Sequence, residues 1–146
     1  MTKKDDFSLQ DFLPYLLNQA AEESSLSFQQ VYKGRYGMLR TEWRVLFHLG
    51  IYGELTATEI VTRARIHKTK VSRAVQKLVE RRFVTRERDG DDRRQERLTL
   101  THSGKVAYRD LQEIGERYQA QLTERLTQDE VAQLKRMLRV LAGLDK

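Results

Sequence analysis

Residues 55–104 decide the fold, and they read LTATEIVTRARIHKTKVSRAVQKLVERRFVTRERDGDDRRQERLTLTHSG. Thr56 and Glu59 have the Ser/Thr-x-x-Glu spacing of a capping box, so a helix is expected to begin at Thr56 or Ala57. The apolar residues that follow recur at helical spacing: Ile60, Val61 and Ala64. Residues 65–67 then remain for a short turn. This segment therefore predicts one short helix and a tight turn.

A second helix is predicted from Lys68. Its apolar residues fall on one face with a period of about 3.6 residues: Val71, Ala74, Val75, Leu78 and Val79. The opposite face carries Lys68, Thr69, Lys70, Ser72, Arg73, Gln76 and Lys77. In a DNA major groove, Arg and Gln can read base edges, while Lys, Thr and Ser can hold phosphates. The alternative interpretation is an ordinary solvated helix face.

A β-hairpin is predicted after this helix. Residues 83–88 alternate in polarity, Asp-Gly stands at 89–90, and residues 97–100 form the returning arm. The loop between the arms carries Asp91, Asp92, Arg93 and Arg94. An Arg at such a tip can enter a narrow minor groove, and Asp92 could hold the arginines in position. A solubilising loop is the alternative, but two helices followed by a basic hairpin are typical of a winged helix-turn-helix.

The tract 71–82 that enters a strand, Asp92-Arg93-Arg94, and Leu100-Thr101-x-x-Gly104 together resemble the multiple-antibiotic-resistance regulator (MarR) family of bacterial transcription factors. The resemblance covers about residues 12–144 and makes Asp92 and Arg94 the matching wing positions. It implies a mainly α fold with a small β-wing, in which a winged helix-turn-helix DNA-binding module is flanked by N- and C-terminal dimerisation helices. Phe83 departs from the family pattern, because many members have Gly before the strand.

Helices are also predicted before the module. Pro14 suits the first turn of a helix of about twenty residues, because its missing N–H costs nothing there. The segment that follows is expected to be a linker and contains Gly34, Tyr36, Gly37 and Met38. A shorter helix capped by Thr41 is expected next.

After Gly104 a long helix is expected, followed by a last helix opened by a second capping box at Thr127 and Glu130. The last helix carries a narrow apolar seam of the helix-pairing kind: Val131, Leu134, Leu138 and Leu141. We therefore predict a single MarR-type domain over residues 1–146. Its parts are an N-terminal dimerisation helix (8–37), the winged helix-turn-helix region (38–104) and C-terminal dimerisation helices (105–146). A purely intramolecular helical core is the alternative.

Net charge supports a nucleic-acid partner. The chain carries +6, and residues 54–105 hold 14 Lys+Arg against 8 Asp+Glu, whereas the remainder holds 13 of each. The excess positive charge thus lies in the predicted module, which favours DNA over an anionic membrane or an acidic protein. The first ten residues lack the apolar core of a signal peptide, and no apolar run approaches a membrane span. A cytoplasmic protein without a membrane partner is expected.

Enzymatic chemistry is not indicated. The sequence has no Gly-rich phosphate loop, no nucleophile elbow and no His-Glu-x-x-His motif. Its histidines at 48, 67 and 102 lack metal-ligand spacing, and there is no cysteine for a thiolate site or an oxidant sensor. We expect no enzyme, no cofactor and no metal.

An aromatic cluster precedes the module, with Tyr36, Trp43, Phe47 and Tyr52. Core packing explains it simply, but the resemblance implies a small-molecule pocket in this region. The candidate pocket residues are Tyr36, Arg40, Trp43, Arg44, Phe47 and His48. The arginines and the histidine would suit an anionic ligand.

The sequence as a whole predicts a homodimeric, sequence-specific DNA-binding transcriptional regulator, a repressor relieved by a small aromatic or anionic effector. Its partners would be a near-palindromic double-stranded DNA operator and a second copy of the chain. A nonspecific architectural DNA binder and a winged-helix dimer that binds protein are the alternatives.

Overall fold

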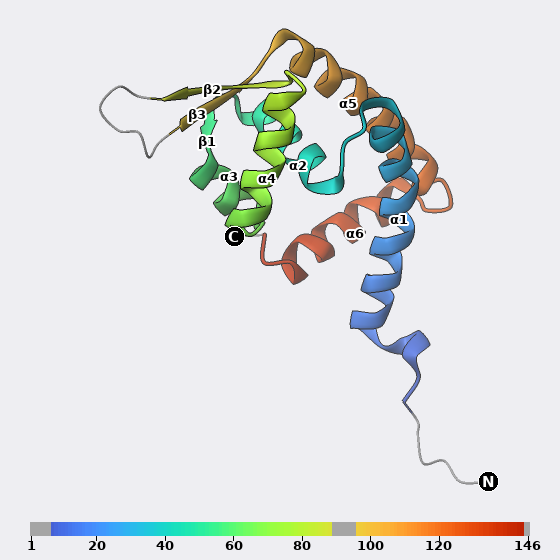
Figure 1. Ribbon diagram of the computed structural model, residues 1–146. Helices are drawn as coiled ribbons and strands as arrows, with labels where there is room; N and C mark the ends of the chain where they lie inside the picture. Colours follow the sequence, from blue (N-terminus) through green and yellow to red (C-terminus); the bar gives the residue numbers. More distant parts are fainter. Residues whose placement is uncertain (1–6, 89–95, 145–146) are drawn as a thin grey trace, which may run out of the picture. The chain divides into compact units, whose positions relative to one another are not determined.

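The computed structural model describes residues 7–88 and 96–144 (Figure 1). In chain order the elements are η1 (Leu9–Asp11), α1 (Leu13–Tyr36), α2 (Arg40–Tyr52), β1 (Leu55–Thr56), α3 (Ala57–Ala64), α4 (Lys68–Glu80), β2 (Val84–Arg88), β3 (Glu96–Leu100), α5 (His102–Leu122) and α6 (Gln128–Leu141). The mainly α fold with a small β-wing is therefore confirmed. The chain forms two compact units, Met1–Gln112 and Glu113–Lys146, and α5 runs from the first into the second. The predicted division into dimerisation and DNA-binding parts remains a prediction.

Local capping explains where α3 and α4 begin. Thr56 Oγ1 accepts a hydrogen bond from the Glu59 N–H at 3.2 Å, and Glu59 Oε1 accepts one from the Thr56 N–H at 2.9 Å, which completes the predicted capping box. Arg65 ends α3 with φ +55°, a left-handed conformation that usually favours Gly. His67 then caps α4, because its Nδ1 accepts from the Thr69 N–H at 3.2 Å. The predicted helix-turn-helix forms without a glycine.

The wing is a three-stranded antiparallel sheet with strand order β1-β3-β2. Its hairpin pairs Val84 with Leu100 and Arg86 with Leu98. The short β1, which the sequence analysis missed, pairs Leu55 with Leu98. A strand of two residues is too short to show the alternation of apolar and polar side chains by which strands are predicted. The predicted Asp-Gly turn at 89–90 lies outside the described residues.

The turn between α4 and β2 differs from the expectation. Arg82 has φ +66°, so the position that favours glycine is Arg82 and not Phe83. Phe83 instead packs against the core, and its ring meets the Tyr36 ring edge-on at 6.0 Å between centroids. Its backbone N–H donates to the Leu78 carbonyl at 2.9 Å. An apolar side chain at 83 therefore helps to fix the entry into the wing.

The start of α5 is tied to this turn. The Thr101 N–H donates to the Phe83 carbonyl at 3.0 Å, and Thr101 Oγ1 donates to the Arg82 carbonyl at 2.6 Å. The same hydroxyl oxygen accepts from the Gly104 N–H at 3.0 Å and so caps the helix. The Leu-Thr-x-x-Gly sequence thus joins the wing to α5 through backbone contacts.

The first unit has one apolar core. α1 contributes the buried Tyr32, and the other elements contribute fully buried side chains: Val45 and Leu46 from α2, Ile60 from α3, Val71 and Leu78 from α4, Val84 and Leu98 from the sheet, and Leu111 from α5. The linker residue Met38 is also fully buried. This core fixes α4 and the wing against a common support.

Two predicted boundaries near α1 and α2 are wrong. The first helix continues through Gly34 to Tyr36, and only Gly37, with φ +63°, ends it. The second helix begins at Arg40 after Leu39, so Thr41 lies inside it and is not its cap. Instead, Glu42 Oε1 accepts from the Leu39 N–H at 3.3 Å. The carboxylate of the third helical residue thus satisfies the backbone N–H of the cap residue, whose own side chain has no hydroxyl.

The second unit contains the end of α5 and all of α6. Thr127 and Glu130 form the predicted capping box, with hydrogen bonds of 3.1 and 2.9 Å. None of the side chains of α6 is buried, and Leu134, Leu138 and Leu141 are 39%, 39% and 58% exposed. Within the described ranges, no helix is both long and apolar enough to span a membrane.

Candidate nucleic-acid interface

The second helix of the helix-turn-helix, α4, has two distinct faces. Val71, Ala74, Val75 and Leu78 are buried against the core. The seven residues of α4 predicted to contact DNA are all exposed: Lys68, Thr69, Lys70, Ser72, Arg73, Gln76 and Lys77. Because burial of one face fixes the rotation of the helix, the cationic face is turned to solvent.

This face is strongly positive along its length. Four of the thirteen residues of α4 are Lys or Arg, and its acid, Glu80, stands at the C-terminal end. A groove of about 330 Å³ runs beside it, lined by Leu39, Thr41 and Glu42 together with Lys70, Arg73, Ala74 and Lys77. The groove places Lys70, Arg73 and Lys77 of α4 beside the start of α2.

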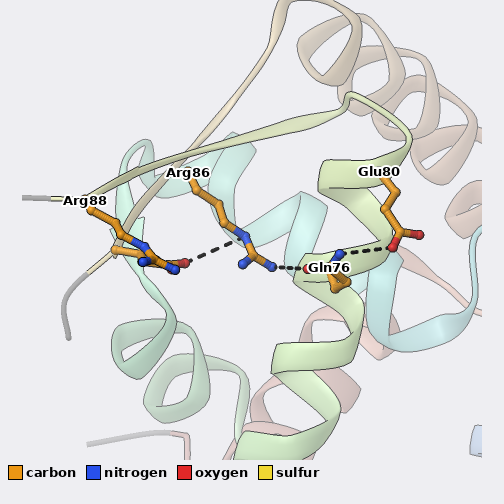
Figure 2. A network of polar contacts seen from close by, with 5 residues as sticks. Gln76, Glu80, Arg86 and Arg88 are labelled. Carbon is orange, nitrogen blue, oxygen red and sulfur yellow. Dashed lines mark hydrogen bonds and ion pairs between the residues drawn. The ribbon is translucent and has the colours of Figure 1, made fainter. Parts of the chain in front are cut away.

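Gln76 is already hydrogen-bonded at both ends of its amide (Figure 2). Its Nε2 donates to Glu80 Oε2 at 3.0 Å, and its Oε1 accepts from Arg86 Nη2 at 2.7 Å. Arg86 lies on β2, so this contact joins α4 to the wing. The sequence analysis missed Arg86 and Glu80, although the four-residue spacing of Gln76 and Glu80 on one helix was a visible signal.

The described part of the wing carries further arginines. Arg88 Nε donates to Glu96 Oε1 at 3.0 Å, and Arg97 lies 4.0 Å from Glu87. On the same face of the hairpin as Glu87 and Arg97, the hydroxyls of Thr85 and Thr99 are 2.8 Å apart and hydrogen-bonded. The predicted minor-groove arginines, Arg93 and Arg94, and their supporting Asp92 lie outside the described residues.

Of the six candidate pocket residues, Trp43 and Phe47 come together in an aromatic cluster. The Trp43 ring stacks on Tyr32, with centroids 5.4 Å apart, and lies 5.2 Å from Phe47. Phe28 and Tyr108 extend the cluster at 5.4 and 5.0 Å. These rings come from α1, α2 and α5. Trp43 Nε1 is nevertheless buried without a hydrogen-bond partner in the described ranges.

Arg40, Arg44 and His48 follow on α2. Arg44 Nη2 donates to the Ala64 carbonyl at 2.5 Å and so caps the end of α3. Burial, with a smaller effect from the neighbouring charge of Arg40, lowers the pKa of Arg44 from its ordinary value. The His48 Nδ1 lies 2.7 Å from the Arg44 carbonyl. Arg44 is therefore partly engaged in holding α3 against α2.

Tyr36 belongs to a different cluster, at the end of α1. Its hydroxyl donates to Asp110 Oδ2 at 2.6 Å, and Arg35 donates to the same oxygen at 2.9 Å. Burial, followed by the Asp110 hydrogen bond and charge, raises the pKa of Tyr36 to about 12. The Tyr36 backbone carbonyl also accepts from Arg81, which follows α4. Tyr36 thus links α1 both to α5 and to the C-terminal end of α4.

A second cavity, of about 350 Å³, is lined by none of the six candidate residues. Its walls come from the end of α2, β3 and the first turns of α5, and they include Gly50, Glu54, Lys105, Tyr108 and Arg109. No group of His, Cys, Asp or Glu side chains that could hold a metal ion occurs in the part of the chain that the structure describes.

Comparisons with known proteins agree on one family. A sequence model of the MarR family matches residues 36–95. The uncharacterized HTH-type transcriptional regulator YwoH of Bacillus subtilis strain 168 is 29% identical over 76 residues, which are 52% of this chain and 55% of that protein. The match thus spans about half the length of this relative.

Solved structures show the same fold. A mutant of Escherichia coli MarR in complex with operator DNA has a TM-score of 0.81 at 22% identity, over 94% of this chain and 99% of that one. Bordetella bronchiseptica BpsR, whose DNA binding is regulated by 6-hydroxynicotinic acid, has a TM-score of 0.81 at 20% identity, over 89% and 98%. Together with the family-model match over residues 36–95, these structures show that the chain has the winged-helix fold of MarR-family transcriptional regulators.

Proposed function

We propose that the protein is a homodimeric, sequence-specific DNA-binding transcriptional repressor that a small ligand releases from its operator. The observation that carries this proposal is the solvent-facing surface of α4, on which all seven predicted DNA-contacting residues are exposed. An exposed helix that combines cations with short hydrogen-bonding side chains suits a major groove. The MarR relative, solved with operator DNA, supports the same use of the fold.

The contacts divide into two classes by chemistry. Lys68, Lys70 and the wing arginines Arg93 and Arg94 would bind phosphates or the minor groove and position the protein. Ser72, Arg73 and Gln76 lie further along the same face and would read base edges. Phosphate contacts give affinity that depends on salt, whereas base contacts give selectivity.

Dimerisation is supported by apolar surface that the described residues leave uncovered. Leu134, Leu138 and Leu141 on α6 are all exposed, although they share one helical face. Burying a leucine fully contributes about 1.5–3 kcal/mol, so a second copy would cover this face favourably. A two-fold dimer would place its recognition helices about 10 base pairs apart, on a near-palindromic operator.

The effector is proposed to be a small aromatic acid. 6-Hydroxynicotinic acid regulates DNA binding by BpsR, and the α2 region of this chain offers aromatic rings next to Arg40, Arg44 and His48. The orphaned Trp43 Nε1 is one donor that a ligand could satisfy. Such a ligand would release the operator only if it bound the DNA-incompetent form of the dimer more tightly.

The test is a binding selection from a randomised duplex pool at about 0.15 M salt, an ionic strength at which nonspecific binding is weakened. Enrichment of a palindrome with half-sites about one helical turn apart is expected. Tight binding without enrichment would instead indicate a nonspecific architectural protein. An absence of binding would leave a winged-helix dimer that recognises protein.

A further inference from the structure

The Gln76 amide is held between an acid on its own helix and an arginine on the wing (Figure 2). Glu80 accepts from Gln76 Nε2 at 3.0 Å, and Arg86 donates to Gln76 Oε1 at 2.7 Å. A side-chain amide has two N–H donors and two acceptor lone pairs. One donor and one lone pair therefore remain available for a base, in an orientation that the two neighbours determine.

Arg86 is itself held in place. It lies on the same face of β2 as the buried Val84, because side chains alternate along a strand. Its Nε is buried and lies 3.7 Å from Glu96 Oε2 on β3, and its side chain is only 29% exposed. The guanidinium is thus directed toward α4 rather than into solvent, which suits a supporting role better than a phosphate contact.

We propose that Arg86 is a positioning residue that sets the base selectivity of Gln76. In this relay of four side chains, Glu80 holds the Gln76 amide and Glu96 holds the Arg86 guanidinium. The inference rests on the proposed DNA-binding function. The physical reason is that an amide rotated by 180° exchanges its donor and its acceptor. Adenine presents an acceptor and a donor side by side in the major groove, so an amide of fixed orientation matches it, whereas a rotating amide accepts other bases as well.

The test repeats the duplex selection with Arg86→Met, which keeps the aliphatic stem and removes the guanidinium. Preference is expected to fall about tenfold at one base pair in each half-site, the base pair that Gln76→Ala also affects. The salt dependence of binding should stay unchanged, because no phosphate contact is lost. In a variant that combines Arg86→Met with Gln76→Ala, the two losses of base preference should not add, since each substitution removes the same oriented amide.

Arg88→Met is the matched control. Arg88 lies two residues along the same strand and also contacts Glu96, at 3.0 Å, but among the described residues it makes no hydrogen bond to Gln76. Its removal is expected to leave the preference at the Gln76 position intact. Glu80→Ala supplies a second variant at an exposed position, where folding is not at risk. It should lose about threefold in preference at the same base pair while binding all duplexes more tightly, because one negative charge leaves the DNA-facing helix.

Each contrary result has a distinct meaning. A salt slope lowered by about 0.9 in Arg86→Met, with equal losses on all duplexes, would make Arg86 a phosphate contact and overturn the inference. Additive losses in the double variant, or an equal loss in Arg88→Met, would also overturn it. If Arg86→Met did not fold, full selectivity in Glu80→Ala would count against the relay. A wild-type protein without any site preference would instead refute the proposed function itself.

Discussion

The substitution Gly104→Ala tests the backbone joint between the wing and α5. A Cβ built at Gly104 lies 2.1 Å from the Phe83 carbonyl oxygen and 3.1 Å from its carbonyl carbon. Ordinary contact begins at 3.4 Å, so the carbonyl would have to move by more than 1 Å. That carbonyl accepts the hydrogen bond from the Thr101 N–H. Because the obstacle is backbone, no side-chain rotation can relieve it.

The magnitude follows from three contributions. Forcing an extra methyl into a packed site costs about 1–3 kcal/mol, and a clash with rigid backbone places this case near the upper end. Loss of the Thr101 hydrogen bond adds about 1 kcal/mol. Replacing glycine by alanine within a helix returns up to about 1 kcal/mol. The free energy of unfolding should therefore fall by about 2–3 kcal/mol.

Gly34→Ala is the matched control, because Gly34 also lies in a helix but has no heavy atom within 4 Å of the position that a methyl group would occupy. It should raise the free energy of unfolding by about 0.5–1 kcal/mol. Both variants would be measured by urea unfolding at the same protomer concentration, since the proposed dimerisation would make stability depend on concentration. A change of less than about 0.5 kcal/mol for Gly104→Ala, or the same sign for both variants, would refute this reasoning.

Three further predictions address the interface, the Tyr36 contact and assembly. Arg73→Ala should weaken the free energy of binding to the selected operator by about 1–3 kcal/mol and relax sequence selectivity. Lys70→Ala should instead weaken binding to all duplexes alike and lower the salt slope by about 1. Fluorescence anisotropy at several salt concentrations measures both effects. Tyr36→Phe should lower the free energy of unfolding by about 1–2 kcal/mol near pH 8, because the hydrogen bond to Asp110 is lost. Since the pKa of Tyr36 is raised to about 12, this difference should be complete below pH 10 and shrink as pH rises toward 12. Leu138→Glu should raise the dimer dissociation constant at least about tenfold in sedimentation experiments, because a charge would enter the apolar interface.

Other outcomes would contradict these expectations in different ways. Equal losses on operator and random DNA for Arg73→Ala would remove its role in base reading. A stability difference for Tyr36→Phe that stayed constant up to pH 12 would show that burial and Asp110 do not raise the pKa of Tyr36 in the folded protein. For assembly, Gln133→Glu on the same helix is the control, and an equal effect from both substitutions would indicate a general charge effect rather than a defined seam.

Short-range signals were sufficient for much of the fold. The capping boxes at Thr56 and Thr127 correctly predicted the starts of α3 and α6, and the apolar period correctly predicted the buried face of α4. The same period placed the proposed DNA-contacting residues of α4 on its exposed face. The Thr41 cap failed because the Glu42 carboxylate, which is also local, satisfies the Leu39 N–H instead. The six pocket residues followed from the aromatic cluster and the family resemblance, neither of which revealed that Tyr36 pairs with Asp110.

The sequence by itself determined the helices, the hairpin strands and the cationic face of α4, because caps, turns and helical periods depend on residues within a few positions of one another. Only the tertiary structure decided the pairing of Leu55 with Leu98, the left-handed conformation of Arg82 and the contact between Gln76 and Arg86. These features depend on which surfaces the common core brings together. The side chains that orient the proposed base-reading amide are therefore set by the packing of the wing against α4, which no local pattern encodes.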